Sequence, residues 1–142
     1  MRKLQFTIEI NAPDEKVWDA LWLDENYRAW CSVFQDGSYY VSDLAEGSEI
    51  QFLNPDRNGM FGIVEKNVRK QKMYFRHLGE VINGEKQEEI YGEEAIEYYD
   101  LVERDDITEL TATLKTSEDY IPYFAETFPK ALEKVKEIAE NS

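Results

Sequence analysis

The chain has 142 residues and a mass of 16.7 kDa, which is about the size of one ordinary domain. Its 16 Lys and Arg against 30 Asp and Glu give a formal net charge of −14, and its longest basic cluster is residues 69–72. A nucleic-acid binder is excluded because it needs a basic surface to displace counterions. With 42% hydrophobic and 32% charged residues, the chain is too apolar for disorder and too charged for a membrane protein.

Targeting signals, disulfides and cofactor sites are not expected either. No run of about 18 apolar residues occurs, and the first six residues alternate in polarity, unlike a secretory signal. Cys31 is the only cysteine, so no intrachain disulfide can form and we expect a cytoplasmic location without membrane insertion. One His and one Cys do not make a typical zinc site, and no catalytic motif or cofactor motif is present.

The N-terminal part of the chain predicts one strand followed by two short helices. Leu4, Phe6, Ile8 and Ile10 alternate with polar residues, which is typical of a half-buried strand. Pro13 then suits the first position of a helix that continues to about residue 22. A second short helix is expected over residues 24–30.

The middle of the chain predicts six strands, and its end predicts one long helix. Short connections between the strands indicate an antiparallel meander. The acidic stretch 79–94 is expected to be an irregular, solvated loop, with a divalent-cation site as the alternative. The final helix carries apolar residues at intervals of three and four, with Pro122 in its first turn and a bend at Pro129. The strands are expected at 39–42, 49–53, 60–68, 73–78, 95–103 and 109–115, and the helix at 118–140.

These elements predict one α+β domain over residues 1–142. The only element long enough to cover the apolar face of the sheet is the final helix, so a curved antiparallel sheet of about seven strands should wrap around it. Such an arrangement leaves room for a ligand-sized cavity lined by aromatic and apolar side chains. The candidate lining residues are Trp22, Trp30, Phe34, Tyr39, Phe52, Met60, Phe75, His77, Tyr98, Phe124 and Phe128.

Several segments resemble a known superfamily. Residues 10–13, followed by 17–21 and Trp30, are similar to the opening of START-like (SRPBCC) helix-grip proteins, and so are residues 44–48 with Gly59 and Gly62. The branch that the chain resembles most is that of bacterial homologues of a heat-shock chaperone ATPase activator, near polyketide-cyclase-like proteins. The resemblance implies the helix-grip fold and an apolar cavity between sheet and helix. It also raises a homodimer and a chaperone as possible partners, although the activator's other domain has no counterpart here.

Three functions remain open at this point. The first is a module that binds a small hydrophobic or amphipathic molecule in the cavity. The second is a cyclase-like or hydrolase-like enzyme that uses His77 and Tyr98 as acid–base groups, and the third is a chaperone partner. His77 shares a strand face with Met73 and Phe75, and that face is either the concave or the outer one. Cys31 has no identifiable activating base and is expected to be a buried, inert thiol.

Overall fold

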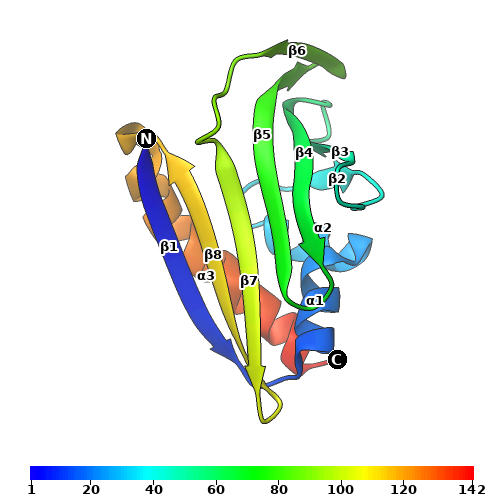
Figure 1. Ribbon diagram of the computed structural model, residues 1–142, viewed down its shortest axis with the longest axis vertical. Helices are drawn as coiled ribbons and strands as arrows, with labels where there is room; N and C mark the ends of the chain where they lie inside the picture. Colours follow the sequence, from blue (N-terminus) through cyan, green and yellow to red (C-terminus); the bar gives the residue numbers. More distant parts are fainter.

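A computed structural model describes all residues, 1–142, as one antiparallel sheet with three α-helices against it (Figure 1). The two early helices and the long final helix are present as the sequence predicts. In chain order the elements are β1 (Arg2–Ile10), α1 (Asp14–Trp22), α2 (Asp24–Cys31), β2 (Tyr39–Val41), β3 (Glu49–Leu53), β4 (Gly59–Val68), β5 (Lys72–Ile82), β6 (Glu85–Glu89), β7 (Ile96–Arg104), β8 (Ile107–Thr116), a 3₁₀ turn (Glu118–Tyr120) and α3 (Ile121–Glu140).

The strands follow one another as a meander, which confirms the predicted topology. Their order is β1-β8-β7-β5-β4-β3-β2, with β6 paired to the far end of β5. The first strand, β1, pairs antiparallel with the last strand, β8, so that Arg2 lies opposite Thr116 and Ile10 opposite Thr108. The chain start therefore lies beside the strand that leads into α3.

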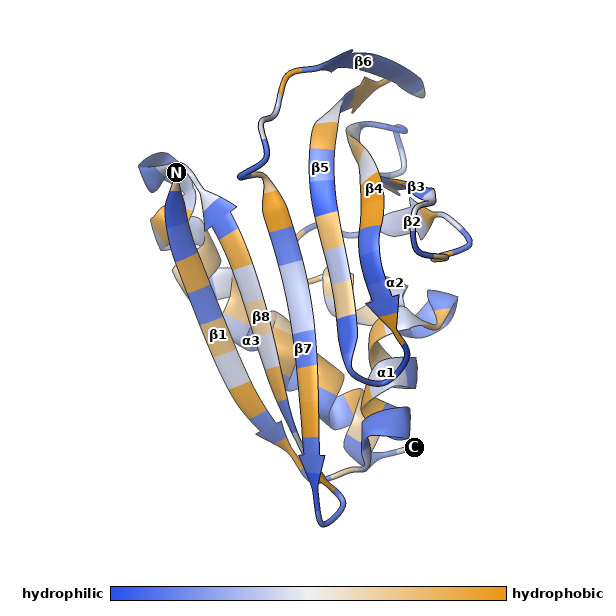
Figure 2. Ribbon diagram, viewed as in Figure 1, coloured by the Kyte–Doolittle hydropathy of each residue, from blue (hydrophilic) through white to orange (hydrophobic).

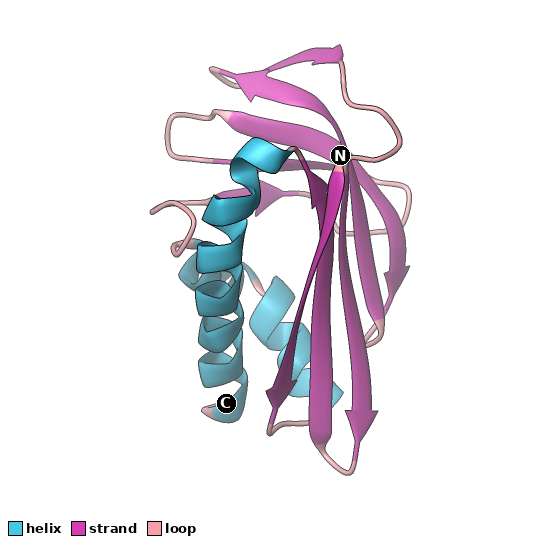
Figure 3. Ribbon diagram, turned by 90° about the vertical axis from the view of Figure 1, so that its left-hand side faces the viewer, coloured by secondary structure: helices cyan, strands magenta, loops and turns pink.

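All three helices lie on one side of the sheet, and the sheet curves toward them at its upper end (Figure 3). The apolar residues of β1 alternate with polar ones, as Figure 2 shows in its colour bands. The core between the two layers contains 24 buried residues, and α3 contributes five of them at intervals of three and four: Phe128, Ala131, Leu132, Val135 and Ala139. Pro122 lies in the first turn of α3 as expected, and Pro129 lies inside the helix. The bend at Pro129 stays a prediction.

The prediction of an irregular loop over residues 79–94 was wrong for residues 79–89, which form a β-hairpin. There β5 continues to Ile82 and turns through Asn83 and Gly84 into β6. Both turn residues have positive φ, 52° and 80°, as a two-residue hairpin of type I′ requires. Every residue of β6 is exposed, so backbone pairing with β5 holds this strand instead of apolar burial. The Asn83-Gly84 pair is a sequence signal for such a hairpin, and hydrophobic alternation alone does not reveal it.

Candidate functional site

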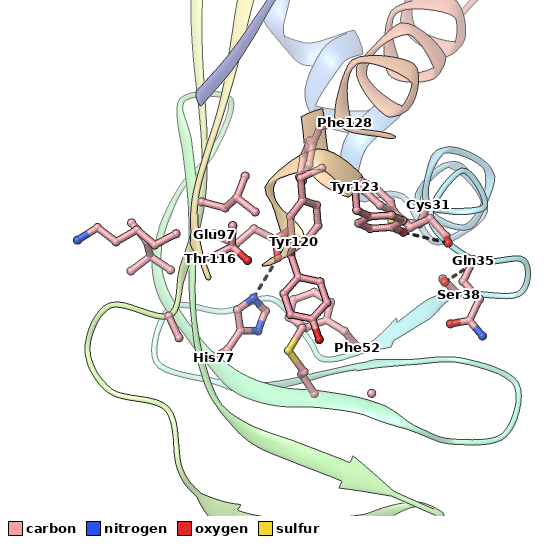
Figure 4. Close-up of a pocket in the computed structure, with 18 of the residues that line it drawn as sticks. Cys31, Gln35, Ser38, Phe52, His77, Glu97, Thr116, Tyr120, Tyr123 and Phe128 are labelled. Atoms are coloured by element: carbon pink, nitrogen blue, oxygen red, sulfur yellow. Dashed lines mark hydrogen bonds and ion pairs between the residues drawn. The ribbon is translucent and has the colours of Figure 1, made fainter. Parts of the chain in front are cut away.

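A cavity of about 690 Å³ lies between the sheet and the first half of α3, and α2 forms part of its wall (Figure 4). Of the 28 residues that line it, 18 are hydrophobic, so a bound molecule would meet a mainly apolar surface. Tyr120 and Tyr123 belong to this lining and are 59% and 45% exposed, which places them at the opening to solvent. The volume falls within the range of about 300–1,000 Å³ that is usual for small-molecule pockets.

Most of the residues predicted from the sequence lie at this cavity. Eight of the eleven candidates line it: Trp30, Phe34, Tyr39, Phe52, Met60, His77, Phe124 and Phe128. Trp22 and Phe75 do not, because both are buried in the core behind the wall. There Phe75 packs edge-on against Phe52, with 5.2 Å between the ring centroids. These two residues support the lining instead of forming it.

Tyr98 lies on the opposite face of the sheet, which corrects its predicted place in the cavity. Successive side chains of a strand point to opposite faces, and in β7 Glu97 and Tyr99 point inward. Tyr98 stacks on Tyr74 with 4.0 Å between centroids and donates a hydrogen bond to Glu65. Burial and this bond raise the pKa of Tyr98 to about 12, so its phenol stays protonated at neutral pH.

Apart from Tyr39 and His77, the polar residues of the lining were not predicted from the sequence. Among them is Glu97 of β7, the one acidic side chain of the lining. Its signal was an isolated carboxylate in an otherwise apolar strand, from Ala95 to Tyr99. Further polar or hydroxyl-bearing lining residues are Tyr27, Gln35, Ser38, Tyr39, Asn54, Asn58, Tyr91, Tyr99, Lys115, Thr116, Ser117, Tyr120 and Tyr123.

Trp30 is fixed in the cavity wall by the end of α1. The last carbonyl groups of a helix have no partner within it, and no glycine follows α1 to cap them. The Trp30 indole N–H donates to the Leu21 carbonyl at 2.9 Å, and the Tyr40 hydroxyl donates to the Trp22 carbonyl at 2.6 Å. Aromatic side chains of α2 and β2 therefore cap α1 and set the distance between these elements.

His77 and Glu97 form a bonded pair in the wall of the cavity (Figure 4). The Nε2 atom of His77 lies 3.1 Å from a carboxylate oxygen of Glu97, and the hydroxyl of Tyr99 donates to the other oxygen. The ring of Phe52 packs edge-on against the imidazole at 5.3 Å. His77 is only 8% exposed, and its Nδ1 atom is buried without a hydrogen-bond partner. The predicted common face of His77, Met73 and Phe75 is thus the concave one.

Burial and hydrogen bonding act in opposite directions on these groups. Burial alone would raise the pKa of Glu97, but the bond to His77, the charge of that ring and the bond from Tyr99 together lower it. Glu97 is therefore a carboxylate at neutral pH. Burial also raises the pKa of the Cys31 thiol far above its ordinary value. Cys31 lines the cavity as a protonated thiol, in keeping with the inert role expected for it.

Two further observations concern metal binding and membrane-spanning helices. No group of three or more His, Cys, Asp or Glu side chains is placed to hold a metal ion. None of the helices combines the length and the apolar character that crossing a membrane requires.

Comparison with known proteins shows the fold through solved structures. Protein NE0264 from Nitrosomonas europaea has a TM-score of 0.70 at 16% identity, over 98% of this chain and 94% of that one. The Aha1 dimer from Colwellia psychrerythraea gives 0.70 at 17%, over 99% and 97%. DynU16, a protein of the dynemicin biosynthetic locus, gives 0.72 at 12%, over 97% of this chain and 47% of DynU16. No protein-family model and no curated protein matches the sequence. The likeness confirms the predicted helix-grip fold, including its similarity in fold to an Aha1 protein.

Proposed function

We propose that this protein is a binding module that holds a small hydrophobic or amphipathic molecule between its sheet and α3. The observation that carries the proposal is the cavity of about 690 Å³, mainly apolar, with the hydrogen-bonded His77–Glu97 pair in its wall. Because the cavity opens to solvent at Tyr120 and Tyr123, its apolar lining is in contact with water. A hydrophobic guest that displaces this water removes apolar surface from it, which favours binding.

The walls are built to keep their shape around such a guest. Trp30 is tied to α1 by its indole N–H, and Phe128 packs against Phe6 and Phe34 with centroids 5.3 and 5.0 Å apart. Aromatic side chains that are held in this way lose little further freedom when a molecule binds. Exposed Tyr120 and Tyr123 give that molecule a route from solvent to the interior.

Dye binding and a pair of tryptophan variants test the proposal. Met60 lines the cavity from β4 and is half-buried, so Met60→Trp should fill part of the volume and weaken the binding of Nile red at least about tenfold. Val41→Trp is the matched control, because Val41 is 55% exposed and lies outside the lining. Native mass spectrometry of the purified protein should show a bound small molecule. Absence of both the bound molecule and dye binding, or equal binding by the two variants, would refute the proposal.

A second function, acid–base catalysis in the same cavity, is favoured by the orientation of His77. An imidazole that is held by a carboxylate is a common arrangement of a general base, and His77 lies in the cavity wall. The cyclase-like or hydrolase-like alternative therefore keeps His77 and loses Tyr98. To test this, the molecule extracted from the protein is incubated with the wild-type protein and with His77→Phe. A change in its mass with the wild-type protein alone would favour the enzyme over the binding module.

We further propose a single domain that works in the cytoplasm and pairs with a second copy of itself. Buried, reduced Cys31 suits a reducing compartment, and the similar Aha1 protein is a dimer. Light scattering coupled to size-exclusion chromatography tests the pairing, and a mass of 16.7 kDa in solution would contradict it. The chaperone is the remaining candidate partner, and the acidic surface of this chain is the feature that favours such an interaction. An ATPase assay with the host's heat-shock chaperone tests it.

A further inference from the structure

The strand β1 is a long open edge of the sheet (Figure 1). Free N–H and C=O groups along an edge pair readily with other chains, so proteins usually shorten, bend or block their edge strands. β1 has nine residues without a proline, and it pairs with β8 without a bulge. The other strands with a free edge are shorter, because β2 has three residues and β6 has five. β1 is therefore the edge with the most unpaired backbone to offer.

The register of β8 determines which backbone groups of β1 are unpaired. A two-residue turn, Asp105-Asp106, with φ of 51° and 63°, joins β7 to β8. In such a hairpin the flanking residues, Arg104 and Ile107, form a hydrogen-bonded pair, and the direction of the backbone groups alternates from there. The odd-numbered residues of β8 thus bond to β7 and its even-numbered residues to β1. Even-numbered residues of β1 lie opposite the latter, so its odd-numbered residues point outward.

The backbone of Glu9 supports this direction. Its carbonyl accepts a hydrogen bond from the Nζ atom of Lys136 on α3 at 2.9 Å. That is the one side-chain bond made to the outward backbone groups of Lys3, Gln5, Thr7 and Glu9. A carbonyl oxygen has two lone pairs, so this one can still accept a second bond. The outward edge of β1 is therefore open along four residues.

The order of residues in β1 is complementary to itself. Two antiparallel copies centred on Phe6 place Lys3 opposite Glu9 and Gln5 opposite Thr7, each twice. This register joins outward-pointing residues to one another, as hydrogen bonds between the copies require. Lys3 and Glu9 are both exposed, and neither makes an ion pair within the chain. A shift of register by two residues would separate these charges from each other.

The other face of β1 adds apolar contacts in the same register. Leu4, Phe6 and Ile8 pack against the core and are only partly buried there. In the paired strands Leu4 lies opposite Ile8 of the second copy, and the two Phe6 residues lie opposite each other. Apolar pairs of this kind stabilise neighbouring strands. Pairing would therefore cover apolar side chains that β1 leaves partly open to water.

We propose that this protein forms a two-fold dimer in which two β1 strands pair antiparallel about Phe6, so that the two sheets become continuous. The inference rests on the proposed pairing with a second copy, and it adds the surface, the register and the residues. Each copy carries a net charge of −14, which opposes association in general. The two Lys3–Glu9 contacts place opposite charges where the copies meet and thus favour this register over others.

Exchanging the charges tests the register. Lys3→Glu and Glu9→Lys each create two like-charged contacts in the dimer, so each should weaken dimerisation about tenfold or more in analytical ultracentrifugation. An equimolar mixture of the two variants should associate as tightly as the wild type, because every contact in the mixed dimer joins a glutamate to a lysine. Glu109→Lys is the matched control, since Glu109 is exposed beside Glu9 on β8 and lies one strand away from the interface. It changes the net charge equally and should keep dimerisation within about threefold.

A proline tests the backbone bonds. Thr7→Pro removes an outward N–H group and takes no hydrogen bond from the pairing with β8, so the single copy should still fold. This variant should remain a monomer with the circular dichroism spectrum of the folded protein. If it does not fold, the mixture of charge variants decides the question without it.

The outcomes separate the two proposals. A wild-type protein that is monomeric at all concentrations would overturn both the pairing and its β1 surface. A dimer that tolerates both charge variants, or a mixture that does not regain tight association, would overturn the β1 surface and leave pairing through another surface.

Hydrogen exchange gives a second measurement on the unaltered protein. In the dilute monomer the amides of Lys3, Gln5, Thr7 and Glu9 should exchange fast, while those of Leu4, Phe6 and Ile8 are protected by β8. In the concentrated dimer all of these amides should be protected. Fast exchange of the odd-numbered amides in a dimer would contradict the inference.

Discussion

Replacing Trp30 by Phe tests whether the end of α1 depends on a donor from α2. The substitution keeps an aromatic ring in the cavity wall and removes the indole N–H that caps the Leu21 carbonyl. Leu21 and Trp30 are both almost fully buried, so water cannot replace the lost bond.

The expected loss is the sum of two effects. An unpaired buried carbonyl costs about 1–3 kcal/mol, and the smaller ring leaves a space that costs about 1–2 kcal/mol more. Trp30→Phe should therefore lower the free energy of unfolding by about 3 kcal/mol. The entropy of unfolding for this length is about 0.3 kcal/mol per degree, so the midpoint of thermal unfolding should fall by about 10 °C.

The control acts on the neighbouring carbonyl. Tyr40→Phe removes the hydroxyl that caps the Trp22 carbonyl, but Tyr40 is only half-buried and water can take its place. Its expected cost is about 1 kcal/mol, or about 3 °C. Urea unfolding followed by far-ultraviolet circular dichroism measures both variants, since fluorescence would report on Trp30 itself. Equal losses in the two variants, or a loss below about 1 kcal/mol for Trp30→Phe, would refute the reasoning.

The remaining predictions concern a carboxylate, a thiol and a glycine. Because the pKa of Glu97 is lowered in the folded protein, its contribution to stability is present above its unfolded pKa and is lost as the pH falls through its folded pKa. Glu97→Gln should therefore be less stable at neutral pH, with a shallower acid loss in denaturant titrations against pH; an unchanged acid limb would show that the pair with His77 contributes nothing. Native Cys31 should react with a thiol-specific disulfide reagent more than about tenfold slower than the urea-unfolded chain, and comparable rates would contradict its burial. A Cβ at Gly62 would lie 2.3 Å from a backbone oxygen of β5, so Gly62→Ala should cost about 2 kcal/mol or more. Gly92→Ala, in open space, should stay within about 0.5 kcal/mol in the same unfolding assay.

Local patterns in the sequence predicted the framework of the fold well. The alternation in β1 and the spacing of Phe128, Leu132 and Val135 in α3 each depend on near neighbours in the chain, so they can be recognised without knowing what the element packs against. The hairpin at Asn83 and Gly84 was equally local, but it required turn chemistry and not hydrophobic alternation to be recognised.

The residues that line the cavity were predicted less completely than the helices and strands. In β7 both faces carry apolar and polar side chains, so the sequence could not decide whether Glu97 or Tyr98 points inward. The packing of Tyr99 against Trp22 and Trp30 decides it. Trp22 and Trp30 are both almost fully buried in the core, yet only Trp30 also borders the cavity, and nothing in the local sequence distinguishes them.

By itself, the amino-acid order determined which segments become strands and helices and that one long amphipathic helix has to cover an apolar sheet. The tertiary structure decided which side chains share the enclosed space. Residues 77, 97 and 99 come together only because β5 and β7 are neighbours in register, with Phe75 opposite Glu97. Such pairings between distant segments depend on the whole sheet and leave no periodic trace in the sequence.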